Sequence, residues 1–241
     1  GPEMASALVA IGCGATTAPL NPNYRQEEFD FYLNDINAKA LIVEKGSDSV
    51  AIAAAQKRNI AVLSLVFNEA EPAGSFSLEG DPVGVRSGKL GFAGKDDIAL
   101  ILHTSGTTSR PKIVPLTQQN VTASARHIGE SLKLERNDRC MNIMPLFHIH
   151  GLVAGLLASL YKGGISIIPP SGFNALSFFK WLDNTKPTWY TAVPTMHQTI
   201  LARAKRNKNI INTNHLRFIR SSSASLPESV MQELEKTFNT P

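Results

Sequence analysis

Apolar runs of strand length alternate with helical patterns along nearly the whole chain, and this alternation limits the fold more than any other feature. In the first 67 residues, the strand-like runs are KALIVE (39–44) and IAVLSLVF (60–67), with helical stretches at 3–12, 27–38 and between the two runs. Helices that alternate with strands in this way cover the faces of a mainly parallel sheet. The sequence therefore predicts the α/β class.

The second half repeats the alternation. Its strand-like runs are DDIALILH (96–103), a short returning run KIVPL (112–116), ISIIP (165–169), TWYTAV (188–193) and LRFIRS (216–221). A helix is expected after Thr117, with one apolar stripe toward the sheet formed by Val121, Ala125, Ile128 and Leu132. For the last helix, Ser225 and Glu228 fit an S-x-x-E capping box, and its expected buried stripe is Leu226, Val230, Leu234 and Phe238.

A change of composition separates the two halves. Residues 67–95 lose periodicity and gather Gly, Pro, Ser and acidic residues, which is typical of a surface linker. We therefore expect a partial first α/β lobe at 1–66, a linker at 67–95 and a second α/β lobe at 96–241. The two lobes would be stacked, with helices on the faces of their sheets.

Composition and charge exclude several classes of protein. The formal charge of +4 is scattered among acidic residues, so nucleic acid is not indicated as a partner. Two cysteines without metal-ligand spacing argue against a zinc site and against a disulfide framework. The uncharged stretch 143–161 contains a proline, two histidines and two glycines, so a strand end, a polar loop and a short buried helix are expected there instead of a membrane span.

The stretch TSGTTSRPK (104–112) combines four hydroxyl side chains from Thr104 to Thr108, a glycine and a lysine, directly after a predicted buried strand. Loops at the carboxyl ends of strands are where open α/β sheets usually bind ligands. Gly106 lets the backbone approach an anion, the hydroxyl groups add donors, and Lys112 adds a positive charge. These features suit a polyphosphate, although an exposed Ser/Thr turn with a solvated lysine would have the same composition.

Two standard nucleotide motifs are disfavoured. A Walker A motif has the lysine after glycine and before Ser or Thr, whereas Lys112 follows Pro111 and precedes Ile113. The stretch GCGATT (12–17) lacks the third glycine of a dinucleotide fingerprint and follows a helical pattern, so it is interpreted as a turn.

TSGTTSRPKIVPL resembles the phosphate-binding signature of the adenylate-forming superfamily, which includes acyl-CoA synthetases, luciferases and peptide-synthetase adenylation domains. Ser109 and Ile113 depart from its common form, in which both positions are glycine. Three further stretches resemble the family in the same order along the chain: APLNP near the start, MPLFHIHGL (144–152), and TWYTAVPT followed by LRFIRSSSASLP.

The resemblance implies that the protein activates a carboxylate with ATP and Mg²⁺ and passes the acyl group to coenzyme A. It implies phosphate contacts for Thr104, Ser105, Gly106, Thr107, Thr108 and Lys112, and adenine contacts for Ser222, Ser223 and Ala224. The family's magnesium-binding glutamate, ribose-binding aspartate and C-terminal lysine have no match before Pro241. We therefore expect a fragment of an acyl-CoA synthetase N-terminal domain that starts inside the first lobe, lacks its C-terminal domain and releases no AMP by itself.

The choice of acid depends on FHIHGL. The resemblance makes His148 the candidate catalytic residue at the border of the acyl site. In an extended loop, His150 would point the same way as His148, so we expect both to face one cavity. Together with Ser223 and Arg220 they would suit a small acid with a second carboxylate. Alternatively, each histidine hydrogen-bonds to nearby backbone, and Arg220 pairs with a surface acid.

The SRPK variant together with PLFHIHGL and RFIRSSSASL is most similar to the oxalate-CoA ligase branch of the family. Oxalate or another small dicarboxylate is thus the expected substrate, with fatty or aryl acids as the alternative. A non-catalytic nucleotide-binding module is the alternative from another class. The other histidines, at 103, 127, 197 and 215, lack metal spacing and are assigned no chemistry. A cytoplasmic location is expected, or a peroxisomal one in a eukaryote.

Overall fold

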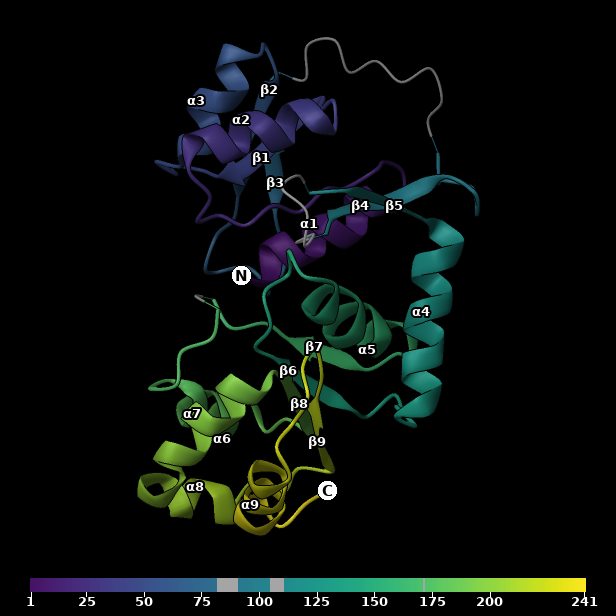
Figure 1. Cartoon of the computed structure of the whole chain (residues 1–241). Helices are drawn as coiled ribbons and strands as arrows, with labels where there is room; N and C mark the ends of the chain where they lie inside the picture. The colour runs from purple at the N-terminus through teal and green to yellow at the C-terminus, as the bar shows by residue number, and fades with distance from the viewer. Residues whose placement is uncertain (82–90, 105–110, 171) are drawn as a thin grey trace. The chain divides into compact units, whose positions relative to one another are not determined.

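Strand pairing in the computed structural model confirms the α/β class (Figure 1). Two units can be distinguished: one is formed by Glu3–Gln119, and the other by Asn120–Pro241 with Gly1–Pro2. The structure describes residues 1–81, 91–104, 111–170 and 172–241.

The Glu3–Gln119 unit contains a three-stranded sheet in the order β1-β2-β3, and a separate pair, β4-β5. Its helices are α1 (Pro2–Gly12), α2 (Gln26–Asp35) and α3 (Val50–Lys57), and its strands are β1 (Ala40–Glu44), β2 (Ala61–Val66), β3 (Ser77–Glu79), β4 (Ile98–His103) and β5 (Ile113–Thr117). The strands β1 and β2 are parallel, as predicted. A small core joins α2 and α3 through Phe29, Leu33 and Ala54.

Two features of this unit differ from the sequence prediction. The strand β3 pairs antiparallel with β2, so part of the expected linker 67–95 belongs to a sheet. Three residues are too short for a period-of-two pattern to be recognised. The pair β4-β5 also groups with this unit, although it was expected in the second lobe. Backbone contacts between Thr17 and β4 explain the grouping, since the Thr17 N–H donates to the carbonyl of Ala99 at 2.9 Å.

The Asn120–Pro241 unit is built on a parallel four-stranded sheet in the order β7-β6-β8-β9. Its strands are β6 (Arg139–Asn142), β7 (Ile165–Ile167), β8 (Trp189–Ala192) and β9 (Phe218–Ser221). Its helical segments are most of α4 (Gln118–Ser131), the π-helix η1 (His150–Leu157), α5 (Ala158–Tyr161), α6 (Phe178–Thr185), α7 (Pro194–Ala204), the 3-10 turn η2 (Lys205–Asn207), α8 (Lys208–Asn212) and α9 (Glu228–Phe238).

The stripe expected on α4 is confirmed in its main part. Ala125 is buried, and Ile128 and Leu132 pack against the cluster that contains Cys140 and Trp189. For α9, the buried stripe is confirmed, since Val230, Leu234 and Phe238 are buried and Leu226 packs against the same core.

The capping box expected at the start of α9 was wrong. The helix begins at Glu228 after Pro227, whose backbone is extended, and no side chain caps it. Proline disfavours the helical conformation in the residue before it, so Leu226 cannot continue a helix begun at Ser225.

The uncharged stretch 143–161 begins directly after β6 and forms a turn and two short helical segments. The loop and a short helix were predicted, whereas the strand ends one residue before the stretch. No helix in the described part of the chain is long and apolar enough to cross a membrane.

A buried carboxylate joins the amino ends of three strands. Asp138 is 6% exposed, and its two oxygens accept hydrogen bonds from the backbone N–H of Glu135, the hydroxyl of Thr188 and the guanidinium of Arg217 at 2.6–3.0 Å. Burial alone would raise the pKa of Asp138, but these donors outweigh burial and hold the pKa below its ordinary value. A depressed pKa means that this stabilisation is present above the unfolded pKa and is lost as the pH falls through the folded pKa.

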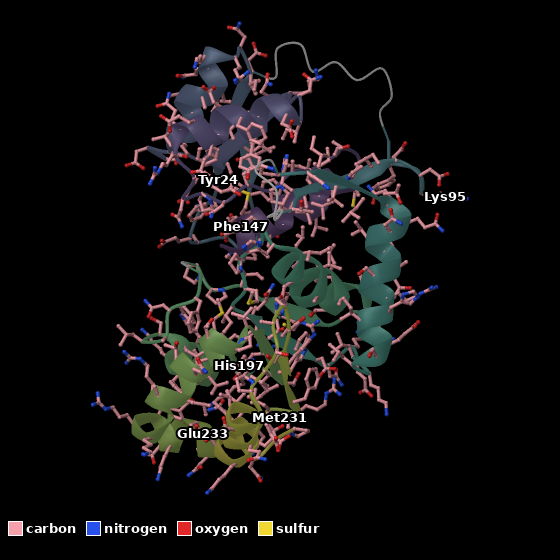
Figure 2. All side chains as sticks on the ribbon, in the orientation of Figure 1. Tyr24, Lys95, Phe147, His197, Met231 and Glu233 are labelled. Carbon is pink, nitrogen blue, oxygen red and sulfur yellow. The ribbon has the colours of Figure 1, made fainter. Side chains whose placement is uncertain are left out.

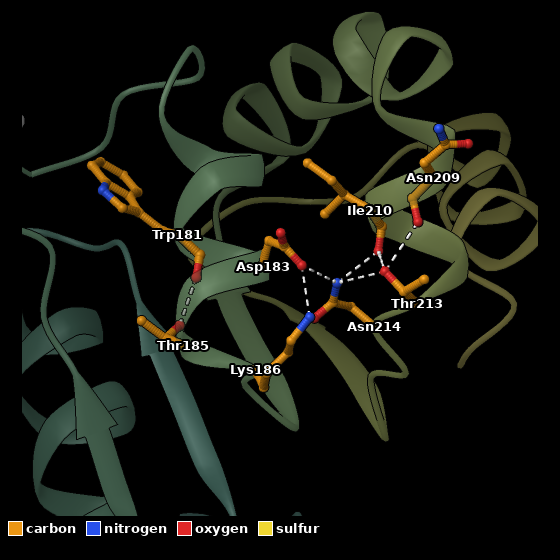
Figure 3. A network of polar contacts seen from close by, with 8 residues as sticks. All are labelled: Trp181, Asp183, Thr185, Lys186, Asn209, Ile210, Thr213 and Asn214. Carbon is orange, nitrogen blue, oxygen red and sulfur yellow. Dashed lines mark hydrogen bonds and ion pairs between the residues drawn. The ribbon is translucent and has the colours of Figure 1, made fainter.

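We expect Asp138→Ala to lower the free energy of unfolding of the chain by about 2–3 kcal/mol at neutral pH, because it leaves the Glu135 N–H, the Thr188 hydroxyl and the Arg217 guanidinium without their acceptor. Urea unfolding at pH 7 measures this. Asp183→Ala is the matched control. Asp183 is a 44%-exposed carboxylate bound to Lys186 and Asn214 (Figure 3), and its removal should change stability little. Equal losses in both variants would contradict the structural role of Asp138.

Candidate functional site

The two ends of the hydroxyl-rich loop are hydrogen-bonded to each other. The backbone N–H of Thr104 donates to the carbonyl of Lys112 at 3.0 Å, and the N–H of Lys112 donates to the Thr104 hydroxyl at 3.3 Å. Thr104 follows β4 and Lys112 precedes β5, so the antiparallel pair holds both residues at one edge. Both side chains are exposed. Ser105, Gly106, Thr107 and Thr108 lie outside the described residues.

In the other unit, the two histidines of FHIHGL do not face one cavity, so this expectation was wrong. His148 is exposed and its ring lies against Phe147, with centroids 4.5 Å apart, whereas His150 is only 5% exposed. The prediction assumed an extended loop. Ile149 instead has helical dihedral angles, and His150 is the first residue of η1. Residues two apart on a helix point in different directions.

Side chains from two parallel strands surround the His150 ring. His150 Nε2 lies 2.6 Å from Thr191 Oγ1 of β8 and 2.9 Å from Arg220 Nη1 of β9, and its Nδ1 lies 3.0 Å from Ser223 Oγ. Thr191 and Ser223 stand at and just beyond the carboxyl ends of these strands. This is the edge of a parallel sheet where ligands usually bind.

The partners of His150 fix its protonation. A guanidinium can only donate, so Nε2 accepts from Arg220, and Nδ1 carries the proton and donates to Ser223. Burial lowers the pKa of His150 to about 4, with the charge of Arg220, His197 and His148 adding to the effect. The imidazole is therefore neutral at pH 7.

Arg220 faces the interior of this cluster. Besides His150, its guanidinium donates to the Thr191 hydroxyl at 3.2 Å and to the Ser222 hydroxyl at 3.3 Å. Burial lowers the pKa of Arg220, yet an arginine remains charged at neutral pH. The alternative that Arg220 pairs with a surface acid was wrong. Strand alternation correctly predicted that Arg220 and Ile219 point to opposite faces of the sheet. The face of Arg220 carries the candidate site.

The segment after β9 brings the expected adenine-binding residues to the surface beside this cluster. Ser223 and Ala224 are exposed, and the Ser222 N–H donates to the carbonyl of Ala192 at 3.3 Å. Ser223 adopts a left-handed backbone with φ of 74°, which is uncommon for a residue with a side chain. Because its oxygen accepts from His150, the described contacts leave the hydroxyl hydrogen of Ser223 available to an acceptor.

Four further histidines were assigned no chemistry, and the two of them that are not exposed have structural partners. His197 lies among the helices of its unit (Figure 2), is fully buried and bonds to the Tyr190 hydroxyl at 3.1 Å. His103 Nε2 contacts Asp35 at 3.2 Å. Among the described residues, no group of three or more His, Cys, Asp or Glu gathers to hold a metal ion.

Sequence reasoning missed Thr191. Its hydroxyl is fully buried and contacts both His150 and Arg220. A polar residue inside the apolar run TWYTAV, one position before the strand ends, was the available signal, because a buried hydroxyl requires a partner.

The whole chain, residues 1–241, matches the AMP-binding enzyme family. It is 42% identical over 240 residues to a probable CoA ligase, CCL9, of Humulus lupulus, which covers 97% of this chain and 45% of that protein. It is 43% identical over 235 residues to an oxalate–CoA ligase of Arabidopsis thaliana, with 97% and 46% covered.

Among solved structures, the apo form of MatB from Rhodopseudomonas palustris superposes with a TM-score of 0.75 at 25% identity, covering 97% of this chain and 46% of that one. The chain thus spans about half the length of the proteins it matches. The match over its full length, the identity to these ligases and the shared fold agree, and the chain belongs to the AMP-binding enzyme family.

Proposed function

We propose that the complete protein is an ATP-dependent acid–CoA ligase that acts on oxalate or a comparably small dicarboxylate. The observation that carries this proposal is the cluster of His150, Arg220 and Ser223 at the carboxyl ends of β8 and β9. The 43% identity to an oxalate–CoA ligase supports the same choice of acid.

In the first step, one oxygen of the acid attacks the α-phosphorus of ATP, an acyl–AMP bond forms, and pyrophosphate leaves. The chemical difficulty is the approach of an anion to phosphate oxygens that are already negative, so the protein must neutralise the polyphosphate and hold the reactants in line. We assign the first task to the loop from Thr104 to Thr108 and to Lys112. Adenine would lie against Ser222, Ser223 and Ala224, and His148 would border the reacting carboxylate.

In the second step, the thiol of coenzyme A attacks the acyl carbon, AMP leaves, and the thiol proton is lost. The other carboxylate of a dicarboxylic acid remains charged throughout and needs a polar partner. We assign this role to the Ser223 hydroxyl, which can donate to a carboxylate while accepting from His150. Arg220 would supply positive charge behind the histidine. An apolar acyl group would offer no acceptor to the Ser223 hydroxyl hydrogen, which disfavours fatty and aryl acids.

The substrate proposal is tested with the complete gene product, ATP, Mg²⁺ and coenzyme A, by measuring AMP release with oxalate, malonate, hexanoate and coumarate. Release with oxalate or malonate in preference to the apolar acids is the expected result. Release with hexanoate or coumarate alone would reject the dicarboxylate while leaving the ligase intact. Specific ATP binding without AMP release for any acid would favour a non-catalytic nucleotide-binding module.

A further inference from the structure

Three neighbouring strands contribute one polar row beneath η1. Asn142 of β6 pairs in register with Thr191 of β8, and Thr191 pairs with Arg220 of β9. Register partners in a parallel sheet point to the same face. Thr191 and Arg220 contact the ring of His150, and Asn142 Nδ2 donates to the carbonyl of the next residue, Gly151, at 2.8 Å. The row therefore contacts the first two residues of the π-helix.

Asn142 also connects this helix to the turn before it. Its Oδ1 accepts from the N–H of Met144 at 3.3 Å, so both ends of its amide are bonded to backbone. The side chain is 1% exposed and lies flat against Gly155, where an added Cβ would come within 2.4–2.6 Å of the amide atoms. Gly155 lies one turn along η1, and because it has no side chain, the Asn142 amide can fill the space beside it.

Asn142 is uncharged and buried, so it is not suited to contact a ligand. Its amide is neutral and fully enclosed, and its polar atoms already have partners. Its position suits a different role, because the Gly151 carbonyl that it holds is adjacent to His150 in the chain. A π-helix is rare and is frequently found at functional sites. The hydrogen bond from Asn142 holds a carbonyl in the first turn of η1.

We propose that Asn142 is a positioning residue of the acyl site, which holds the start of η1 so that the His150 ring reaches Ser223, Thr191 and Arg220. The inference concerns the placement of His150, and it rests on the proposed function only in that His150 serves the bound acid. Asn142 itself contacts no substrate.

The first test is kinetic and uses the complete protein with whichever acid the wild type prefers. In Asn142→Leu, which has similar size but no hydrogen bonds, KM for the acid should rise about tenfold to a hundredfold, because small displacements of a binding group have effects of this size. KM for ATP should stay within about twofold of the wild-type value, since Asn142 lies beneath the side chains that are proposed to bind the acid.

Asn214→Leu is the matched control. Asn214 is also a buried asparagine, and its Nδ2 donates to the Ile210 carbonyl at 2.7 Å and to Asp183 (Figure 3). The control should lose stability as Asn142→Leu does, without a change in KM for the acid. Equal KM values in the two variants would overturn the inference. Absence of oxalate activity in the wild type would overturn the substrate proposal instead, so the two failures are distinguishable.

The second test needs no activity. In an NMR titration of the 241-residue chain, the pKa of His150 should rise from about 4 toward its ordinary 6.5 in Asn142→Leu, as the ring moves away from its buried position and from Arg220. His197, whose pKa burial also lowers to about 4, is the internal reference and should not move. An unchanged His150 pKa would contradict the positioning role.

If Asn142→Leu does not fold, Gly155→Ala displaces the same amide from the opposite side and should raise KM for the acid in the same way. Gly129→Ala is its control, because the added Cβ there would come too close to the flexible Lys162 side chain alone and would lie at an ordinary contact distance of 3.7 Å from the carbonyl oxygen of Ala158. A Gly155→Ala enzyme with the KM of the control would equally overturn the inference.

Discussion

The Lys112→Ala variant of the complete protein is expected to release AMP about a hundredfold to a thousandfold more slowly than the wild type, the usual cost of removing one group that stabilises charge in a transition state. Lys112 is exposed, and its backbone is held to Thr104 in both directions. The loss should therefore come from the ammonium group and leave the fold unchanged. We expect the effect in kcat as well as in KM for ATP.

Lys95→Ala is the control for charge. Lys95 is an exposed lysine of the same unit that lies outside the hydroxyl-rich motif (Figure 2), and its removal should leave AMP release unchanged. Near-normal AMP release by Lys112→Ala would show that the phosphate-binding role proposed for this lysine is wrong. It would leave family membership untouched, since that conclusion rests on the whole chain.

Gly151→Ala is expected to have the largest effect on folding. A Cβ at this position would lie 2.4 Å from the carbonyl oxygen of Pro145 and 2.8 Å from that of Met144. Both obstacles are backbone atoms, so a change of rotamer cannot relieve the overlap. Overpacking of this kind costs about 3 kcal/mol or more, and we expect the midpoint of thermal unfolding to fall by about 10 °C.

Thermal unfolding followed by circular dichroism measures this loss. Gly12→Ala is the matched control, since Gly12 is also helical and an added Cβ there meets nothing within 4 Å. A midpoint for Gly151→Ala close to that of Gly12→Ala would mean that the turn before η1 can move aside. The close packing described between Pro145 and η1 would then be incorrect.

Most of the elements were predictable because their residues show clear periodicity. The stripe of α4, the strands β1, β2 and β8, and the returning strand β5 follow from apolar spacing alone. Two short strands were not predicted. The strand β6 has the sequence RCMN, with polar residues at both ends, and β3 has only three residues. Neither is long enough to show a pattern before its partners are known.

The candidate site was predictable in its residues and not in its geometry. His150, Ser223 and Arg220 were correctly grouped, because each stands in a stretch with an evident role. The predicted orientation of His148 was wrong because FHIHGL was assumed to be extended. Ile149 is helical, so His148 and His150 point in different directions. Thr191 and Asn142 were missed for a further reason. Their proximity depends on strand register, which residues 49 positions apart in sequence do not reveal.

The row formed by Asn142, Thr191 and Arg220 bears on how the range of acids can change during evolution. Each of the three side chains bonds to the same first turn of η1, so the effect of a substitution at one position depends on which residues occupy the other two. Contacting residues of this kind have non-additive effects. Replacement of His150 by an apolar residue would remove one hydrogen-bond partner from the half-buried guanidinium of Arg220 and one from the buried hydroxyl of Thr191. Substrate range should therefore shift through linked replacements on separate strands, with single replacements mostly giving poor enzymes for either kind of acid.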